Sequence, residues 1–328
     1  MDARSVRVGS LTADQVETAV LQATAAPSLR NCQPWLVRST PHGIELHADR
    51  TRMAPVADGD CRELMLACGA ALMNLRLAIG SFGRYPEVHT FPDPARPDLL
   101  AVVLPGGPRP VAPIDRALAA EIPRHRTNRR PFAPVPVPAP LRRELQMAAE
   151  TERAWLAIVD PARLSALHEL VREAHRRQLD DARSRAEWTP RTGGVPAQCG
   201  GPLAEPQDEW VLRDCSGGRA APGEHVDPLI VVLGSFQDGP AARLQAGQAM
   251  QRVLLTATAA GLSASLLSQV VEVAATREQL RALIGGGLWP QTVLRIGYGL
   301  PVPATPRRGV ADVVLVDEYA SARGGRTG

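Results

Sequence analysis

With 328 residues, the chain is too long for a comfortable single core and suits two domains or one duplicated domain. Its formal net charge is only +3, with acidic and basic residues mixed, which excludes a nucleic-acid or membrane-surface role that depends on bulk electrostatics. All 37 basic residues are arginine, a preference that coding bias explains most simply, but the planar and permanently charged guanidinium group also suits phosphate binding.

Helix caps and hydrophobic spacing predict the elements before residue 113. They are a helix from Thr12 or Asp14 to Ala26, a hairpin at 35–47, a helix from about 61 to 79 and a strand at 100–104. The proline- and glycine-rich stretch 105–113 is the strongest candidate boundary between two halves. We therefore expect domains at 1–112 and 113–328.

Beyond residue 113 the sequence predicts a charged helix, a long loop and then regular structure again. The predicted elements are a helix at roughly 161–186, a strand at 229–234, helices at 240–260 and 277–284, and a strand at 292–296. Residues 187–226 are rich in glycine, proline and charge, and loops of this length are usually lids or disordered linkers. We predict such an insertion in the second domain.

Residues 69–83 and 247–261 are similar to each other. Both segments begin with Gly-x-Ala and end with glycine, and Leu77 corresponds to Leu255. The spacing between them is 178 residues (247 − 69), which suggests an internal duplication. Alanine-rich helices also resemble one another by chance, so two unrelated core helices are the alternative.

The segment from Ala26 to Trp35, with the sequence APSLRNCQPW, is the most informative in the chain. Two prolines restrict its backbone, and Ser28, Asn31 and Gln33 provide polar groups on a turn that follows a helix. Amide side chains donate and accept hydrogen bonds along the edge of a planar heterocycle. The segment suits recognition of such a heterocycle, and the simpler alternative is an ordinary loop between helix and strand.

A second segment, PRHRTNRRPF at 123–132, concentrates positive charge. Its arginines surround the hydroxyl group of Thr127, and guanidinium groups bind phosphate through paired hydrogen bonds. Near the end of the chain, a second basic pair, Arg307 and Arg308, follows a strand that ends in glycine. These segments predict an anion site, although a basic run is more often a solvated surface.

Segment 26–35 resembles the APSxxNxQPW signature of the FMN-dependent nitroreductase family. Segment 123–132 is similar to the arginine-rich opening motif of that family, with His125 in place of the first arginine and with Arg130 competing with Arg129 for the last position. The chain looks most like the fused group called the Acg family. A TPRR motif near the C-terminal end is typical of that group, and this chain has it at 305–308. This resemblance implies an α+β, nitroreductase-like fold duplicated within one chain, with antiparallel-rich sheets flanked by helices.

The resemblance also implies that one FMN binds between the two halves. It implies no catalytic side chain and no metal ligand, because the flavin carries the chemistry. In the family, the stretch equivalent to 267–269 supplies backbone N–H groups near the flavin N5, and a tail arginine meets the phosphate; the alignment does not choose between Arg307 and Arg308. The implied cofactor-binding residues are Pro27, Ser28, Asn31, Arg126, Thr127, Arg129, Leu267, Ser268, Gln269, Arg307 and Arg308.

The implied activity is that of an FMN-dependent oxidoreductase, in which NAD(P)H reduces FMN and the reduced flavin passes electrons to a nitroaromatic or quinone-like acceptor. The sequence does not choose between NADH and NADPH, and it does not identify the acceptor. The alternative is an FMN-sequestering or storage protein without turnover, in which residues 187–226 form a lid over the flavin.

Cysteine content and the N-terminal sequence bear on the compartment. The five cysteines are an odd number without CxxC spacing, which indicates neither a disulfide framework nor a zinc site. The first residues lack the apolar run of a signal peptide, and we find no stretch close to the roughly 20 apolar residues that span a bilayer. We expect a soluble, cytoplasmic protein that binds a small-molecule substrate, as a monomer (a pseudo-dimer) or a weak homodimer.

Overall fold

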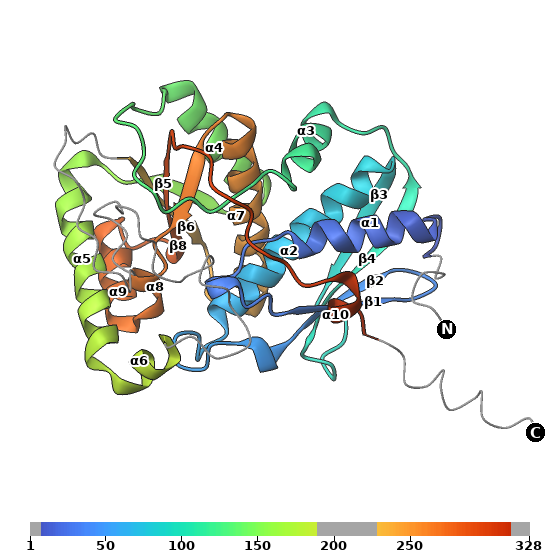
Figure 1. Cartoon of the computed structure of the whole chain (residues 1–328), viewed down its shortest axis with the longest axis horizontal. Coiled ribbons are helices and arrows are strands. Elements are labelled where there is room, and N and C mark those ends of the chain that lie inside the picture. The colour runs from blue at the N-terminus through green and yellow to red at the C-terminus, as the bar shows by residue number, and fades with distance from the viewer. Residues whose placement is uncertain (1–7, 189–227, 316–328) are drawn as a thin grey trace, which may run out of the picture.

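The computed structural model describes residues 8–188 and 228–315, which form two four-stranded sheets and the helices around them (Figure 1). The first elements in chain order are α1 (Ala13–Thr24), η2 (Leu29–Asn31), β1 (Trp35–Ser39), β2 (Ile44–Ala48), η3 (Arg50–Arg52), α2 (Arg62–Ser81), β3 (Arg84–Thr90) and β4 (Leu99–Pro108). They are followed by α3 (Pro113–Glu121), α4 (Ala139–Thr151), β5 (Trp155–Ile158), α5 (Pro161–Asp180), α6 (Ala182–Trp188), β6 (Leu229–Ser235), α7 (Pro240–Ala259), β7 (Ser263–Leu266), α8 (Gln269–Glu272), α9 (Ala274–Leu283), β8 (Trp289–Gly297) and α10 (Val310–Val313).

The two sheets have the same topology. Their strand orders are β1-β2-β4-β3 and β5-β6-β8-β7, and all neighbouring strands within them are antiparallel. In each half, one long helix (α2 or α7) connects the second and third strands. Figure 1 shows these two helices together between the sheets. The repeated order confirms the predicted α+β fold, duplicated within one chain.

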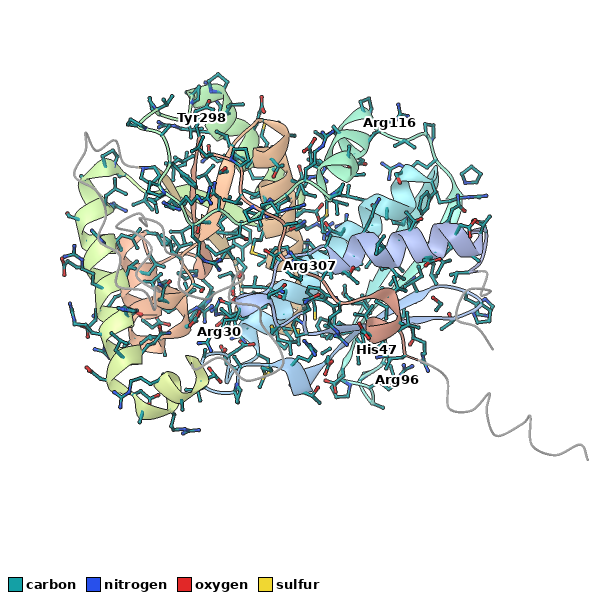
Figure 2. All side chains as sticks on the ribbon, viewed as in Figure 1. Arg30, His47, Arg96, Arg116, Tyr298 and Arg307 are labelled. Carbon is teal, nitrogen blue, oxygen red and sulfur yellow. The ribbon has the colours of Figure 1, made fainter. Side chains whose placement is uncertain are left out.

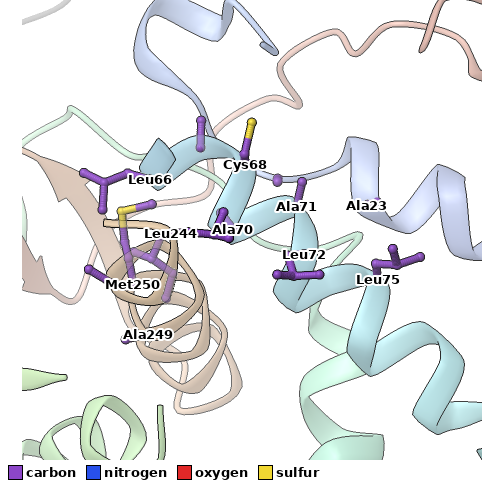
Figure 3. Packing of buried hydrophobic residues seen from close by; sticks show 14 of the residues in the cluster. Ala23, Leu66, Cys68, Ala70, Ala71, Leu72, Leu75, Leu244, Ala249 and Met250 are labelled. Atoms are coloured by element: carbon purple, nitrogen blue, oxygen red, sulfur yellow. The ribbon is translucent and has the colours of Figure 1, made fainter. Parts of the chain in front are cut away.

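Helices α2 and α7 cross at Gly69 and Gly247, and their backbones touch there. A Cβ atom added to Gly69 would collide with the carbonyl oxygen of Leu244, and one added to Gly247 would collide with that of Leu66. Leu66 and Leu244 have the same spacing as the two glycines, so the contacts are reciprocal, as at a twofold interface. Figure 3 shows both leucines among the buried side chains at this crossing. The similarity between the two helical segments therefore reflects equivalent positions in the fold.

The first helix begins where the sequence predicts. Thr12 is the N-cap of α1: its hydroxyl accepts from the N–H of Gln15, and the Gln15 side chain accepts from the N–H of Thr12. This capping box satisfies two of the N–H groups that a helix N-terminus leaves without partners. The helix ends at Thr24, so the chain enters the APS segment immediately afterwards.

Several predicted boundaries differ from the structure. Strand β4 extends to Pro108, so the first residues of the proline- and glycine-rich stretch belong to the sheet. The predicted helix at 161–186 is two helices, α5 and α6, and the second ends at Trp188. Residues 187 and 188 of the predicted insertion are therefore helical, and the rest of it, 189–226, lies outside the described residues.

The last described segment returns to the first sheet. Val314 pairs in parallel with Val37 of β1, and the N–H of Leu315 donates to the carbonyl of Val37 at 2.8 Å. The tail from the end of β8 thus crosses from one sheet to the other, carrying the two tail arginines with it. The domain division at 112/113 remains a prediction.

Helix α2 is, among the described helices, the one with the length and hydropathy needed to cross a membrane. We predicted a helix at about 61–79, but the expectation that no stretch comes close to the apolar length of a membrane span was wrong for α2. Its most apolar window is 83% buried, with α1 and α7 packed against it, which is typical of a core helix. The predicted cytoplasmic location stays a prediction.

Candidate functional site

The APS loop, residues 26–35, has an unusual backbone. Arg30, Asn31 and Gln33 all adopt positive φ angles, of 49°, 57° and 50°. Such conformations are uncommon outside glycine, and they concentrate at functional sites where the surrounding structure enforces them. The hydroxyl of Ser28 accepts from the N–H of Gln33 at 2.9 Å, and the completely buried Trp35 begins β1. The loop is therefore held in one shape from both ends.

Asn31 contacts the C-terminal tail directly. Its Oδ1 accepts a hydrogen bond from Nη1 of Arg307 at 3.0 Å, and its Nδ2 donates to the carbonyl of Pro306 at 2.9 Å. Arg307 also donates through Nη2 to the carbonyl of Ala25, at the end of α1. Figure 2 shows Arg307 in the middle of the molecule, between the two sheets. The structure thus joins two predicted site residues that are 276 positions apart.

Arg308 makes a different set of contacts. Its backbone N–H donates to Oε1 of Gln33 at 2.8 Å, and its guanidinium group donates to the carbonyls of Gln33 and Trp35. The same group lies 3.7 Å from a carboxylate oxygen of Asp49. Arg308 therefore fastens the tail to the first half, while Arg307 lies against Asn31.

The arginine-rich segment packs along the edge of the second sheet. Thr127 forms a parallel bridge with Ala264 of β7, and the N–H of Asn128 donates to the carbonyl of Ala264 at 2.8 Å. Nδ2 of Asn128 donates to Oγ of Ser263 and to the carbonyl of Leu300. Asn128 is 1% exposed, so it is a structural anchor of the segment. Arg126 and Arg129 are only half-buried on either side of it.

A second anchor of this segment is Arg295 of β8, which is completely buried. Its Nη2 donates to the carbonyls of Asn128 and Arg130, each at 3.1 Å. Its guanidinium carbon lies 4.1 Å from the ring centroid of Phe132, a distance typical of a cation–π contact. Neither Asn128 nor Arg295 was predicted as a site residue, and the available signal was an arginine within the predicted strand 292–296.

His125 is buried beside the arginines. Its Nδ1 lies 3.0 Å from Oγ1 of Thr258, and because that hydroxyl donates to the carbonyl of Leu254, we assign the imidazole proton to Nδ1. Its Nε2 is buried without a hydrogen-bond partner among the described residues. Burial, and then the charges of Arg307 and Arg126, lower the pKa of His125 to about 4. The imidazole is therefore neutral at pH 7, with a bare acceptor nitrogen next to two cations.

Leu267, Ser268 and Gln269 directly follow β7 and are all buried. The N–H of Leu267 donates to the carbonyl of Val293 at 2.9 Å, so this group is used in packing against the sheet. Ser268 is the N-cap of α8, and Gln269 is its first residue. Three backbone N–H groups were expected near the flavin N5, and the one from Leu267 instead donates to the carbonyl of Val293.

The described contacts therefore connect much of the predicted site. Asn31 meets Arg307, and the charge of Arg307 acts on His125, which adjoins Arg126. Pro27 is buried at the start of the APS loop and helps to set its path. Among the residues that the structure describes, no group of three or more His, Cys, Asp or Glu could hold a metal ion.

Glu187, near the end of α6, was not predicted to contact the site. Its carboxylate accepts from the N–H groups of Val56 and Ala57, at 2.9 and 3.0 Å, and lies 3.5 Å from Nη1 of Arg30. Arg30 also donates to the backbone carbonyl of Glu187 at 3.0 Å. Arg30 belongs to the APS loop, so the last turn of α6 is fixed against this loop. No periodicity in the sequence predicts such a contact.

Comparison with known proteins identifies the family. The curated protein "Putative NAD(P)H nitroreductase Rv3131" of Mycobacterium tuberculosis is 36% identical over 320 residues, which cover 92% of this chain and 91% of the relative. The chain belongs to the nitroreductase family. A second relative from Mycobacterium tuberculosis, "Putative NAD(P)H nitroreductase acg", is 32% identical over 326 residues, covering 93% and 97% of the two chains. No protein-family model matches the chain.

Solved structures support the same fold. The crystal structure of a nitroreductase-like protein from Anabaena variabilis covers 88% of this chain and 88% of its own, with a TM-score of 0.51 and 12% identity. The match extends over both halves of this nitroreductase-family chain, as a duplicated fold requires. The resemblance found in the APS and arginine-rich segments is thereby confirmed at the level of family and fold.

Proposed function

We propose that this nitroreductase-family chain is an FMN-dependent oxidoreductase, in which NAD(P)H is the reductant and a nitroaromatic or quinone-like compound is the acceptor. The observation that carries the proposal is the hydrogen bond between Asn31 and Arg307, because it brings the amide-bearing APS loop against a tail arginine. The reductant is supported by the two relatives, each of which carries the name "Putative NAD(P)H nitroreductase".

The charged groups in this region fit a flavin phosphate. Arg307 and Arg126 both raise the positive potential at His125, and after burial they are the charged groups that lower its pKa. The buried Nε2 of His125 is one polar atom without a partner among the described residues, as expected where a ligand supplies one. An oxyanion pairs with the two arginines through strong charge-assisted hydrogen bonds, and it accepts a hydrogen bond from Nε2 of His125 once that nitrogen is protonated.

The contacts also favour particular roles for the tail and the loop. We assign Arg307, together with Arg126 and Arg129, to the phosphate. The other tail arginine, Arg308, already donates hydrogen bonds to backbone carbonyls of the first half. The amide of Asn31 is placed to meet the edge of the flavin ring. Ser268 and Gln269 are the candidates for backbone contacts near the flavin N5, since the N–H of Leu267 is already used.

The flavin supplies the hydride chemistry when it is bound, so no acid–base side chain is required. The residues of the chain bind the phosphate, orient the ring and exclude water. The strained APS loop fixes the orientation, because its backbone is held by Ser28, Trp35 and the tail.

The absorption spectrum of the purified protein tests the proposal. We expect a yellow protein with one FMN per chain, which bleaches anaerobically on addition of NADPH or NADH and regains its colour with a quinone or nitroaromatic acceptor. A colourless protein that does not take up added FMN contradicts the flavin site. A flavin that neither nucleotide reduces contradicts the oxidoreductase activity.

The contacts of Glu187 favour a second candidate function, in which the protein holds FMN without turnover. They fix the end of α6 against the APS loop, at the point where the chain enters the predicted lid. A Glu187→Ala substitution releases this attachment, and Glu169→Ala, which removes an exposed ion pair on α5, is the matched control. If sequestration is the function, NADPH oxidation rises in the first variant and stays negligible in the control.

A further inference from the structure

A cavity of about 150 Å³ is lined by residues other than those of the candidate flavin site. It is bounded by the C-terminal part of α2, the start of β3, the segment after β4 and the helix α3. Four arginines line it: Arg76, Arg84, Arg109 and Arg252. We call it the arginine cavity.

The arginine cavity carries an excess of positive charge. Arg76 is paired with Glu152 at 2.7 Å, and Arg252 lies 3.4 Å from Asp115. Within residues 8–188 and 228–315, neither Arg84 nor Arg109 takes part in an ion pair; the guanidinium carbon of Arg109 lies 5.3 Å from the ring centroid of Tyr85. Two of the four cations are thus left without a carboxylate. A cavity of this kind favours an anion that accepts several hydrogen bonds.

The internal duplication relates the arginine cavity to the arginine-rich segment. At the spacing of 178 residues, the lining positions Gly80 and 85–86 correspond to Thr258 and 263–264. In the second half, those equivalent residues hold His125 and Asn128 through hydrogen bonds. In the first half, the same positions face the arginine cavity, whose arginines come from α2, β3, α7 and the segment after β4.

We propose that the arginine cavity binds the phosphoryl group of a small phosphate-bearing anion, at a site separate from the candidate flavin site. Pockets for drug-sized ligands occupy about 300–1,000 Å³, so this volume suits a phosphate group and not a whole flavin. Arg84 and Arg109 bind the oxyanion, and Arg76 and Arg252, fixed by their carboxylate partners, complete the cradle. The proposal does not depend on the flavin site.

Thermal unfolding of the FMN-loaded protein tests this site, because the flavin then occupies its own phosphate position. The probes are inorganic phosphate and the phosphomonoester glycerol 3-phosphate, each compared with chloride at equal ionic strength. Binding to the folded state raises Tm, by about 2 °C at a free probe concentration of about ten times its Kd. A response to one probe alone identifies free phosphate or a phosphomonoester as the ligand, and a response to both assigns recognition to the phosphoryl group.

The double variant Arg84→Gln and Arg109→Gln removes the two unpaired cations, and we expect it to abolish the phosphate-dependent rise in Tm while keeping the Tm in chloride. Arg116→Gln is the matched control, since Arg116 is an exposed arginine of α3 outside the arginine cavity (Figure 2). Equilibrium dialysis with labelled phosphate gives the stoichiometry, expected to be one per FMN-loaded chain. An equal Tm rise in the double variant, or no saturable rise in the parent protein, overturns the proposal.

Discussion

Asn31 accepts a hydrogen bond from Arg307 across the boundary between the two halves of the fold, at 3.0 Å. Asn31 follows α1 in the first half, whereas Arg307 follows the last strand of the second half. The tail reaches this position because Val314 continues to the edge strand β1, so the segment between β8 and Val314 must pass the APS loop. The candidate site is therefore a product of the duplicated fold and of the path of the tail together.

The different environments of Arg307 and Arg308 lead to a first prediction. We expect Arg307→Gln to weaken FMN binding by about 10–100-fold, because a hydrogen bond to a charged group contributes about 1.5–3 kcal/mol. Arg308→Gln, the matched control, should change FMN affinity far less but lower the Tm, since it removes hydrogen bonds to Gln33 and Trp35. Titration of the apoprotein by flavin fluorescence measures the affinities, and the reverse order of effects would refute the assignment of Arg307.

The sequence predicts the elements that have a strong local signal. The start of α1 at Thr12, the helix α2 and the continuous buried strand β6 are all found where expected. Strand β3 was missed because it lies at the sheet edge with alternating exposed positions and contains Pro86, so it lacks an apolar pattern. Helix α4 was also missed, although its buried residues Leu145, Ala148 and Ala149 have the spacing of one helical face.

The candidate site was predictable in its composition but not in its contacts. Motif resemblance identifies Asn31 and the tail arginines, but the two arginines are adjacent and chemically identical. Only the tertiary path of the tail separates them, by directing Arg308 to carbonyls and Arg307 to Asn31. The hydrogen bond between His125 and Thr258 likewise joins residues that lie 133 positions apart in sequence.

The crossing of α2 and α7 leads to a second prediction. Gly69→Ala should destabilise the fold by about 3 kcal/mol or more, because the new methyl group has to displace the backbone of the opposite helix, an overpacking that side-chain movement does not relieve. Gly247→Ala should do the same, since the contact is reciprocal. Chemical denaturation measures both.

Gly80, within the same helix α2, is the control for that comparison. No atom lies within 4 Å of a Cβ added there, so Gly80→Ala should be neutral or stabilising by about 0.5–1 kcal/mol through helix propensity. If all three variants had equal stability, the close crossing of the helices would be wrong.

His125 leads to a third prediction, which depends on the proposed flavin site. Its pKa of about 4 leaves it neutral at pH 7, and a bound phosphate favours the protonated form, so the pKa rises on binding. Binding then takes up protons, and FMN affinity should increase as the pH falls from about 8 toward 5, by at most about tenfold per pH unit. Flavin titrations across this range measure the slope.

The phosphate itself also titrates near pH 6, so the comparison variant is His125→Gln. The phosphate contribution is the same in both proteins, whereas the contribution of the imidazole is lost in the variant. A variant with the same pH slope as the parent protein would show that His125 does not couple to the flavin phosphate.

The ion pairs of Asp238 give a fourth prediction. Asp238 accepts two hydrogen bonds from the guanidinium group of Arg277, at 2.7 and 3.0 Å, and another from Nε of Arg243 at 2.9 Å. Burial alone would raise the pKa of this carboxyl group, but the arginines outweigh it and hold the pKa well below its usual range. Asp238→Asn leaves the nearly buried Arg277 without a carboxylate partner among the described residues and leaves Arg243 with Asp60 alone, and it should cost about 3 kcal/mol at pH 7.

The pH dependence of that cost follows from the depressed pKa. The stabilisation is complete above the pKa of the unfolded aspartate, about 4, and is lost as the pH falls further, so the difference between parent protein and variant narrows below pH 4. The comparison variant is Asp98→Asn, which breaks the ion pair between Asp98 and Arg50. The side chain of Asp98 is 49% exposed and that of Arg50 is 45% exposed, so the loss should cost at most about 1 kcal/mol. Denaturation at several pH values separates the two cases, and equal, pH-independent losses in both variants would contradict the role assigned to Asp238. The role of Asp238 extends to the fold, because Arg277 of α9 also donates to the carbonyl of Pro290 at the start of β8. By holding the guanidinium group of Arg277, Asp238 helps to connect these two elements.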